Sequence, residues 1–128
     1  MGLLDRMMNR NSNIHRDWKT IDQLDQLDAI IEQSKDRPVV LFKHSTTCGI
    51  SAMSKHQLEQ RWDFKEEELD FYYLDLLRYR PISNAIADRL SVIHQSPQII
   101  LLKDGKAVYS TSHHKISVAD LRAAMARN

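Results

Sequence analysis

The stretch that decides the fold of this chain is residues 39–53, which read VVLFKHSTTCGISAM. Its first residues, Val39–Phe42, are β-branched, aliphatic or aromatic, and such a short run is typical of a strand buried on both faces. After a polar corner that contains Cys48, apolar residues return at helical spacing: Ile50, Leu58 and Trp62, with Met53 beside them. The segment predicts a buried strand that turns into a helix, with a cysteine at the corner.

The chain before this segment predicts a short strand and a helix. Residues 18–21, WKTI, alternate between apolar and polar side chains as a strand does. Asp22 is expected to cap the helix that follows. The apolar stripe of this helix is Leu24, Leu27, Ile30 and Ile31. Residues 1–16 are polar and weakly periodic, so we predict a flexible leader there and one domain over residues 17–128.

The chain after the segment predicts a second central strand and another helix. Residues 71–77, FYYLDLL, combine aromatic and aliphatic side chains in the manner of a strand. Pro81 suits the first turn of the next helix. The apolar face of that helix is Ile82, Ile86, Leu90 and Ile93.

A hairpin and a last helix are predicted near the C-terminus. The turn Asp104-Gly105 lies between the strand-like runs 99–102 and 107–110, which is a hairpin signal. Ser117 and Asp120 have the spacing of a helix cap. The order is therefore β-α-β-α-β-α-β-β-α, which predicts an α/β protein with a mixed central sheet and helices on both faces.

Composition and charge exclude several classes of function. The formal net charge is +1 over 128 residues, so the strongly basic face that nucleic-acid binding needs is not indicated. No apolar run approaches the roughly 20 residues that cross a bilayer. Cys48 is the only cysteine and cannot form an internal disulfide, and nothing in the sequence marks export. We expect a cytoplasmic protein, with neither nucleic acid nor membrane among its partners.

The position of Cys48 predicts a reactive thiol. The first turn of a helix has unpaired N–H groups and a partial positive charge, and both favour the thiolate, which is the attacking species in disulfide exchange. Thr46 or Thr47 is expected to cap the helix, and Gly49 leaves room for a partner sulfur to approach. A lone cysteine is more often a small buried hydrophobe. The strand-to-helix corner is what favours the reactive interpretation.

A second feature is Ser96-Pro97, directly before the strand-like run 99–102. Proline is tolerated at the start of a strand, so the pair could mark only that start. The functional interpretation is a cis peptide bond beside Cys48. The backbone N–H and C=O of Ser96 would then be free to pair with an extended thiol substrate, as an added strand does.

These features resemble those of thioredoxins and glutaredoxins in the CGIS spacing of residues 48–51, the later Ser96-Pro97 and the order of elements. More specifically, residues 42–53, 96–98 and 103–106 resemble the YtxJ-type proteins of the bacillithiol system, which are proposed monothiol bacilliredoxins. The resemblance covers about residues 17–125. It implies a thioredoxin-like fold and monothiol disulfide exchange that removes bacillithiol from S-bacillithiolated proteins.

The resemblance also implies roles for individual residues. Cys48 would be the nucleophile, Pro97 the cis-proline, and Ser51 would stand where dithiol relatives place the resolving cysteine and donate a hydrogen bond to the Cys48 thiolate. The residues expected to contact the substrate are Thr47, Gly49, Ser96 and His44. Phe42 replaces the buried aspartate of many thioredoxins, and Ser45 replaces the lysine of many glutaredoxins. No metal or organic cofactor is implied, with bacillithiol acting as the thiol co-substrate.

The two carboxylates of the bacillithiol malyl group would favour a cationic rim. The candidates are Lys43, His44, Lys55, Arg78, Arg80, His94 and Lys103. An imidazolium at His44 would also favour the Cys48 thiolate, although the alternation of side chains along a strand could turn it away.

Other interpretations stay open or are set aside on the residues. Adjacent histidines on a strand face opposite ways, so His113 and His114 are not expected to chelate one ion. The run Glu66–Glu68 is expected to be solvated. Two alternative functions remain: a non-catalytic thioredoxin-like binding module in which Cys48 is buried, and a peroxide-sensing thiol protein.

Overall fold

A computed structural model describes residues 14–128, in which five strands form one mixed sheet in the order β1-β3-β2-β4-β5. The strands are β1 (Lys19–Thr20), β2 (Val39–His44), β3 (Asp70–Asp75), β4 (Gln98–Lys103) and β5 (Lys106–Ser112). β1 and β2 both pair with β3 in parallel, whereas β4 is antiparallel to β2 and to β5. The predicted α/β class and the order of elements are confirmed.

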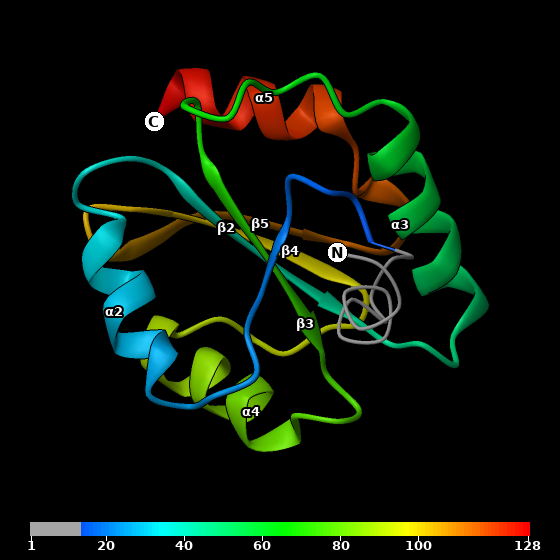
Figure 1. Ribbon diagram of the computed structural model, residues 1–128, viewed down its shortest axis with the longest axis horizontal. Coiled ribbons are helices and arrows are strands. Elements are labelled where there is room, and N and C mark those ends of the chain that lie inside the picture. The colour runs from blue at the N-terminus through cyan, green and yellow to red at the C-terminus, as the bar shows by residue number, and fades with distance from the viewer. Residues whose placement is uncertain (1–13) are drawn as a thin grey trace, which may run out of the picture.

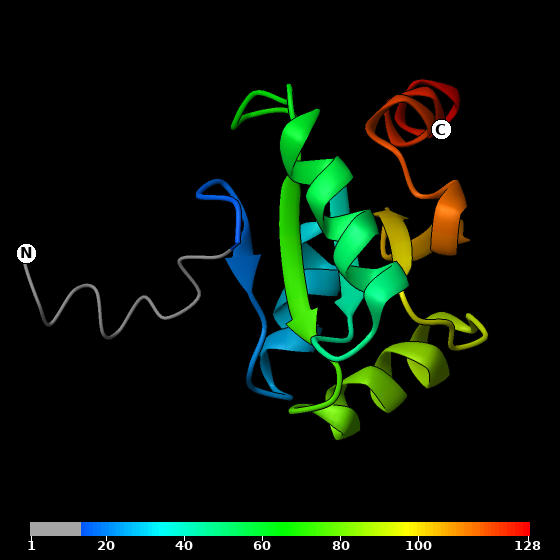
Figure 2. The same ribbon diagram turned by 90° about the vertical axis from the view of Figure 1, so that its right-hand side faces the viewer.

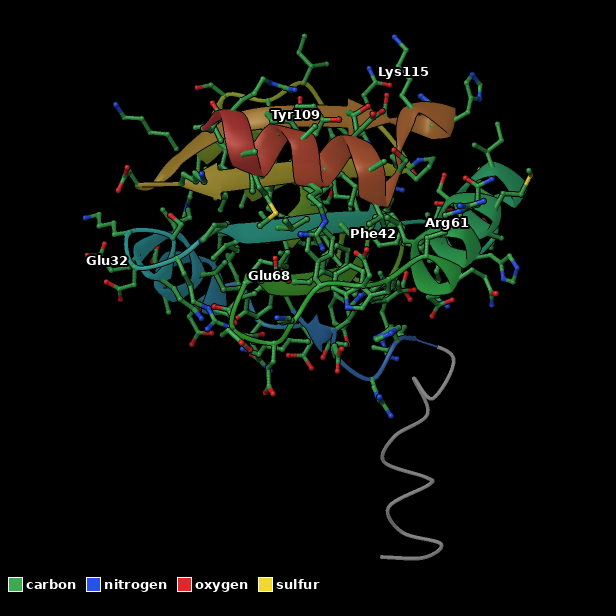
Figure 3. All side chains as sticks on the ribbon, turned by 90° about the horizontal axis from the view of Figure 1, so that it is seen from above. Glu32, Phe42, Arg61, Glu68, Tyr109 and Lys115 are labelled. Carbon is green, nitrogen blue, oxygen red and sulfur yellow. The ribbon has the colours of Figure 1, made fainter. Side chains whose placement is uncertain are left out.

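Helices cover both faces of the sheet (Figure 1). The helices are α2 (Gln26–Gln33), α3 (Gly49–Gln60), α4 (Arg80–Leu90) and α5 (Val118–Arg127), and the short 3₁₀ turn η2 (His113–Lys115) joins β5 to α5. Side chains of β2 alternate between the layers. Val40 and Phe42 belong to the apolar cluster under α3 and α5, whereas Val39 and Leu41 belong to the cluster under α2 and α4. Figure 3 shows Phe42 in the interior and Lys115 at the rim.

One end of the sheet gathers the segments that the sequence singled out. Lys43 of β2 is paired with Gln98, the first residue of β4, and Gln98 is paired with Ser112, the last residue of β5. His44, the last residue of β2, is paired with Asp75, the last residue of β3. We call this end the site edge and the opposite end, where β2 and β3 begin, the far edge. Figure 2 shows α3 beginning where β3 ends.

Several apolar positions differ from the prediction. Leu24, Ile50, Met53 and Ile93 are exposed. Leu58 of α3 is buried as predicted, and the other buried residues of the helix are Ser51 and Ser54. The Ser51 hydroxyl accepts the Ser45 N–H and the Ser54 hydroxyl donates to the His113 carbonyl, so both serines have partners on the inner face. Ile93 lies beyond the end of α4.

Of the predicted caps at Ser117 and Asp22, only the one at Ser117 is confirmed. Ser117 accepts a hydrogen bond from the backbone N–H of Asp120 and caps α5 as expected. The expected cap at Asp22 is wrong, because α2 begins at Gln26 with Asp25 in the cap position, and the Gln26 side chain accepts from the Asp22 backbone N–H instead.

The Asp104-Gly105 turn is confirmed, with left-handed φ values of 54° and 78°. Most of the predicted leader, residues 1–13, lies outside the described residues. Ile14 already packs against the apolar cluster under α3 and α5. Within residues 14–128, no helix has the length and apolar character that crossing a membrane requires.

Candidate functional site

Cys48 lies at the junction between β2 and α3, as predicted. It is the N-cap residue of α3, with extended backbone angles, and its carbonyl accepts the Ala52 N–H at 3.0 Å. The residue is a free, half-buried cysteine outside both apolar clusters. The expected cap from Thr46 or Thr47 is absent, since Cys48 itself occupies the cap position and no side chain there bonds to the helix. The N-terminal end of α3 therefore lies directly at the thiol.

Two neighbours of Cys48 have different surroundings. Gly49 is exposed, and a side-chain carbon placed on it would meet nothing within 4 Å, so the approach to the thiol is open there. Ser51 is 0 % exposed, and its Oγ accepts the backbone N–H of Ser45 at 3.0 Å. The donation to Cys48 that we expected is not among the hydrogen bonds of residues 14–128. Ser51 instead fixes the corner that precedes the thiol.

The Ser96-Pro97 bond is cis, as predicted. The Pro97 carbonyl accepts the His113 N–H at 3.1 Å, and the His113 carbonyl accepts the Ser54 hydroxyl of α3 at 3.2 Å. His113 has a φ of 57° at this point. The helix that begins at Cys48 is therefore tied through His113 to the cis-proline. Within the described part of the chain, no hydrogen bond occupies the backbone N–H or C=O of Ser96.

His44 is on the α3 face of the sheet but is not a cation. Its side chain lies between the rings of Phe42 and Tyr73, at 5.7 and 5.4 Å between ring centroids, and the residue is 4 % exposed. Burial and the nearby charge of Lys55 lower the pKa of His44 to about 4, and its Nδ1 has no hydrogen-bond partner. The imidazolium that the sequence suggested is therefore not available near neutral pH.

The candidate cations of the rim are divided among different places. Lys55 forms an ion pair with Glu59 at 3.1 Å, and Lys103 donates to the Met125 carbonyl at the far edge. Arg78 lies over the Tyr79 ring.

Three of the rim candidates do gather. Lys43 Nζ lies 3.1 Å from His94 Nδ1. Burial, followed by the positive charges of Lys43 and Arg80, lowers the pKa of His94. This cluster of Lys43, Arg80 and His94 is at the site edge.

Sequence analysis missed two features of this edge. One is His113, whose only signal was its place beside a second histidine. It lies in a 3₁₀ turn rather than on a strand. The other is the full burial of Lys43, because a lysine in a strand is normally assigned to a solvated face. No group of three or more potential metal ligands occurs among residues 14–128.

Comparison with known structures supports the fold. A thioredoxin-fold protein described provisionally as an oxidoreductase is 34 % identical, with a TM-score of 0.71 over 83 % of this chain and 91 % of that one. Thioredoxins of Malassezia sympodialis and Fasciola hepatica are 21 % and 22 % identical, with TM-scores of 0.67 and 0.65. They cover 86 % and 85 % of this chain and 89 % and 97 % of their own. The thioredoxin-like fold is confirmed.

Comparison with protein families is more specific. Residues 19–121 match the family described as monothiol bacilliredoxin BrxC. The match spans the whole sheet from β1 and reaches into α5, so it includes Cys48, the cis-proline and His113. The chain belongs to the monothiol bacilliredoxin family.

Proposed function

We propose that Cys48 removes bacillithiol from S-bacillithiolated proteins by monothiol disulfide exchange. The Cys48 thiolate attacks the bacillithiol sulfur of a protein mixed disulfide. A new disulfide forms between Cys48 and bacillithiol, the old disulfide breaks, and the protein thiolate leaves and takes a proton from water. No electrons leave the three sulfur atoms, because one disulfide replaces another.

A second exchange regenerates the thiol. The thiolate of a free bacillithiol attacks the bacillithiol sulfur of the adduct, which releases oxidised bacillithiol and the Cys48 thiolate. Ser51 cannot replace this external thiol, because a hydroxyl forms no disulfide. The chemistry needs no cofactor, and it needs a pool of reduced small thiol, so we place the protein in the cytoplasm.

The observation that carries this proposal is the single thiol at the start of α3, tied to a cis-proline at the same sheet edge. The free backbone groups of Ser96 support binding of an extended peptide beside Cys48. The open space at Gly49 supports the approach of a disulfide, and Thr47 is exposed next to the thiol. Arg80 is exposed at the site edge, close enough for its positive charge to lower the pKa of His94, and it supports recognition of an anionic small thiol.

Intact-mass analysis tests the proposal. The protein is incubated in parallel with oxidised bacillithiol, oxidised glutathione and coenzyme A disulfide. We expect one adduct at Cys48, formed fastest with bacillithiol, and release of bacillithiol from a bacillithiolated protein. Cys48→Ser should form no adduct and release none. Release by Cys48→Ser at the wild-type rate would contradict the mechanism, and sulfenic acid formation without mixed disulfides would favour a peroxide sensor.

Ser51→Cys sharpens the test, because it places a second thiol at the resolving position. The variant should release its own adduct without added thiol and lose two hydrogens as an internal disulfide forms. Ser54→Cys is a matched control on the same inner face of α3, three residues beyond the resolving position. If Ser51→Cys kept its adduct as long as the wild type does, the proposed equivalence to dithiol relatives would be wrong.

A further inference from the structure

Lys43 is a buried cation that the exchange mechanism does not use. Its side chain is 0 % exposed on the face covered by α2 and α4, and Nζ donates to the Ser83 carbonyl of α4 at 3.1 Å. None of the ion pairs within residues 14–128 includes Lys43. Burial lowers its pKa to about 8. Burying an ammonium group without a carboxylate opposes folding, so stability does not explain this residue.

The contacts of Lys43 lead to the loop that carries the cis-proline. We call residues 91–97, between α4 and β4, the proline loop. Lys43 Nζ lies 3.1 Å from His94 Nδ1 in this loop. Since Lys43 supplies only N–H donors, His94 Nδ1 is the acceptor.

A second buried side chain holds the same loop. Gln98 is 2 % exposed and is paired directly with Lys43 across β2 and β4, so the two side chains lie on the same face. Its Oε1 accepts the Gln95 N–H at 3.2 Å, and its Nε2 donates to the Ile93 carbonyl at 3.0 Å. Lys43 and Gln98 together bond to three consecutive residues of the proline loop.

We propose that Lys43 and Gln98 are a positioning pair that fixes the proline loop, and with it the substrate-binding backbone of Ser96, beside Cys48. This inference rests on the proposed exchange function for its catalytic consequence. The pair acts from the face of the sheet opposite α3. The pair therefore affects the binding of a peptide disulfide through the proline loop, without contacting the Cys48 thiol.

The test is Lys43→Met, which keeps the length of the side chain and removes the charge. We expect a melting temperature at pH 7 that is unchanged or higher, and an unchanged alkylation rate of Cys48 by iodoacetamide. Exchange with a bacillithiolated peptide should fall by about 10- to 100-fold, as misplaced binding groups commonly cause. The Gln95 amide should lose protection from hydrogen exchange. Leu41→Met, on the same strand and face, is the control and should change none of these.

Gln98→Met is the second variant and should show the same loss of peptide exchange. The double variant should lose less than the product of the single effects, because both side chains hold one loop. Wild-type exchange and Gln95 protection in Lys43→Met would overturn the proposal. So would a parallel fall in melting temperature and alkylation rate, which indicates a structural role. If the wild-type protein exchanges no disulfide, the proposed function fails, and Gln95 protection still decides whether the pair holds the loop.

Discussion

The two edges of the sheet differ in whether their buried polar and charged side chains have partners of opposite charge. At the far edge, Asp70 is 3 % exposed and accepts from Lys19 Nζ at 2.9 Å, from Arg37 at 2.8 Å and from Gln33 at 2.6 Å. Burial raises the pKa of Asp70, but these bonds from Arg37 and Lys19 outweigh burial and lower it overall. At the site edge, and counting only partners within residues 14–128, Lys43 has no carboxylate partner and His44 Nδ1 has no hydrogen-bond partner.

The difference separates stability from function. A buried carboxylate that accepts from two cations and one amide holds β1, β3 and the end of α2 together. Buried polar groups with incomplete partners weaken the fold, and they occur at the sheet edge that carries the cis-proline and the start of α3. Changes at the far edge should therefore alter unfolding and leave exchange intact, whereas changes at the site edge should alter exchange or acid stability.

The largest expected effect is at the far edge. Asp70→Asn should reduce the free energy of unfolding by about 3 kcal/mol, because it leaves two cations without their buried partner. Urea denaturation at pH 7 measures this loss, and the rate of disulfide exchange by the folded variant should equal that of the wild type. A stability loss confined to pH values below 4, or a large loss of exchange, would break the separation of the edges.

The next effect is the acid sensitivity of the site edge. The pKa of His44 is lowered from 6.5 to about 4, so the unfolded chain binds a proton in this range and the folded protein does not. The contribution of His44 to wild-type stability should therefore fall as the pH drops from 6.5 to 4, by at most about 1.4 kcal/mol per unit. His44→Phe should remove this part of the slope and be about 2 kcal/mol more stable than the wild type at pH 4.5.

The contribution of Asp70 has a different pH window. Its pKa is depressed, so its stabilisation is present above the ordinary value of 3.8 and is lost only as the pH falls below that value. The pKa of His94 is lowered too, but His94 contributes equally to both proteins. The difference between the urea midpoints of His44→Phe and the wild type at pH 7.5, 5.5 and 4.5 therefore reports on His44. An equal difference between His44→Phe and the wild type at all three pH values would contradict the assignment.

A smaller effect is expected at the corner before the thiol. Ser51→Ala leaves the buried Ser45 N–H without its acceptor and should cost about 1 kcal/mol of stability. Because the corner that presents Cys48 loosens, the alkylation rate of Cys48 should change too. Ser54→Ala, which removes the bond to His113, is the comparison on the same helix face. If Ser51→Ala altered stability alone, the corner would not control the thiol.

The smallest effect is expected at Gly49. Gly49→Ala meets no atom within 4 Å and favours helix, so it should be neutral or stabilising by a few tenths, about 0.3 kcal/mol. Exchange with small disulfides should persist, whereas exchange with protein mixed disulfides should slow if the open space admits a bulky partner. Paired rate measurements with both substrates decide this. If Gly49→Ala slowed exchange with neither substrate, a protein partner would not need the open space at Gly49.

Periodicity predicted the strands well and one face of α3 poorly. The run of Val39–Phe42 and the turn at Gly105 depend on local chemistry, and both are where the sequence placed them. Ile50 and Met53 share a helical spacing with the core but are exposed. Ser51 and Ser54 are buried in their place, where their hydroxyls bond to Ser45 and His113. Apolar spacing cannot distinguish an inner face of small polar residues from an outer face.

The parts of the site that depend on local sequence patterns could be predicted. A cysteine at a strand-to-helix corner and a serine-proline pair before a strand are local patterns, and both are confirmed in position. The pairing of Lys43 with Gln98 depends on the register between β2 and β4, which no local pattern specifies. The same holds for the burial of His44, because neighbouring strands and helices decide it.

His113 joins segments that are made at different times. Its N–H bonds to Pro97 and its carbonyl to Ser54, so the surface beside the thiol needs residues from the last third of the chain. A chain emerging from the ribosome contains Cys48 and Ser54 well before Pro97 or His113 has been made. Under the proposed function, the nascent chain carries its sulfur nucleophile early, whereas the surface proposed to bind the substrate forms only after β4 and η2 have been made.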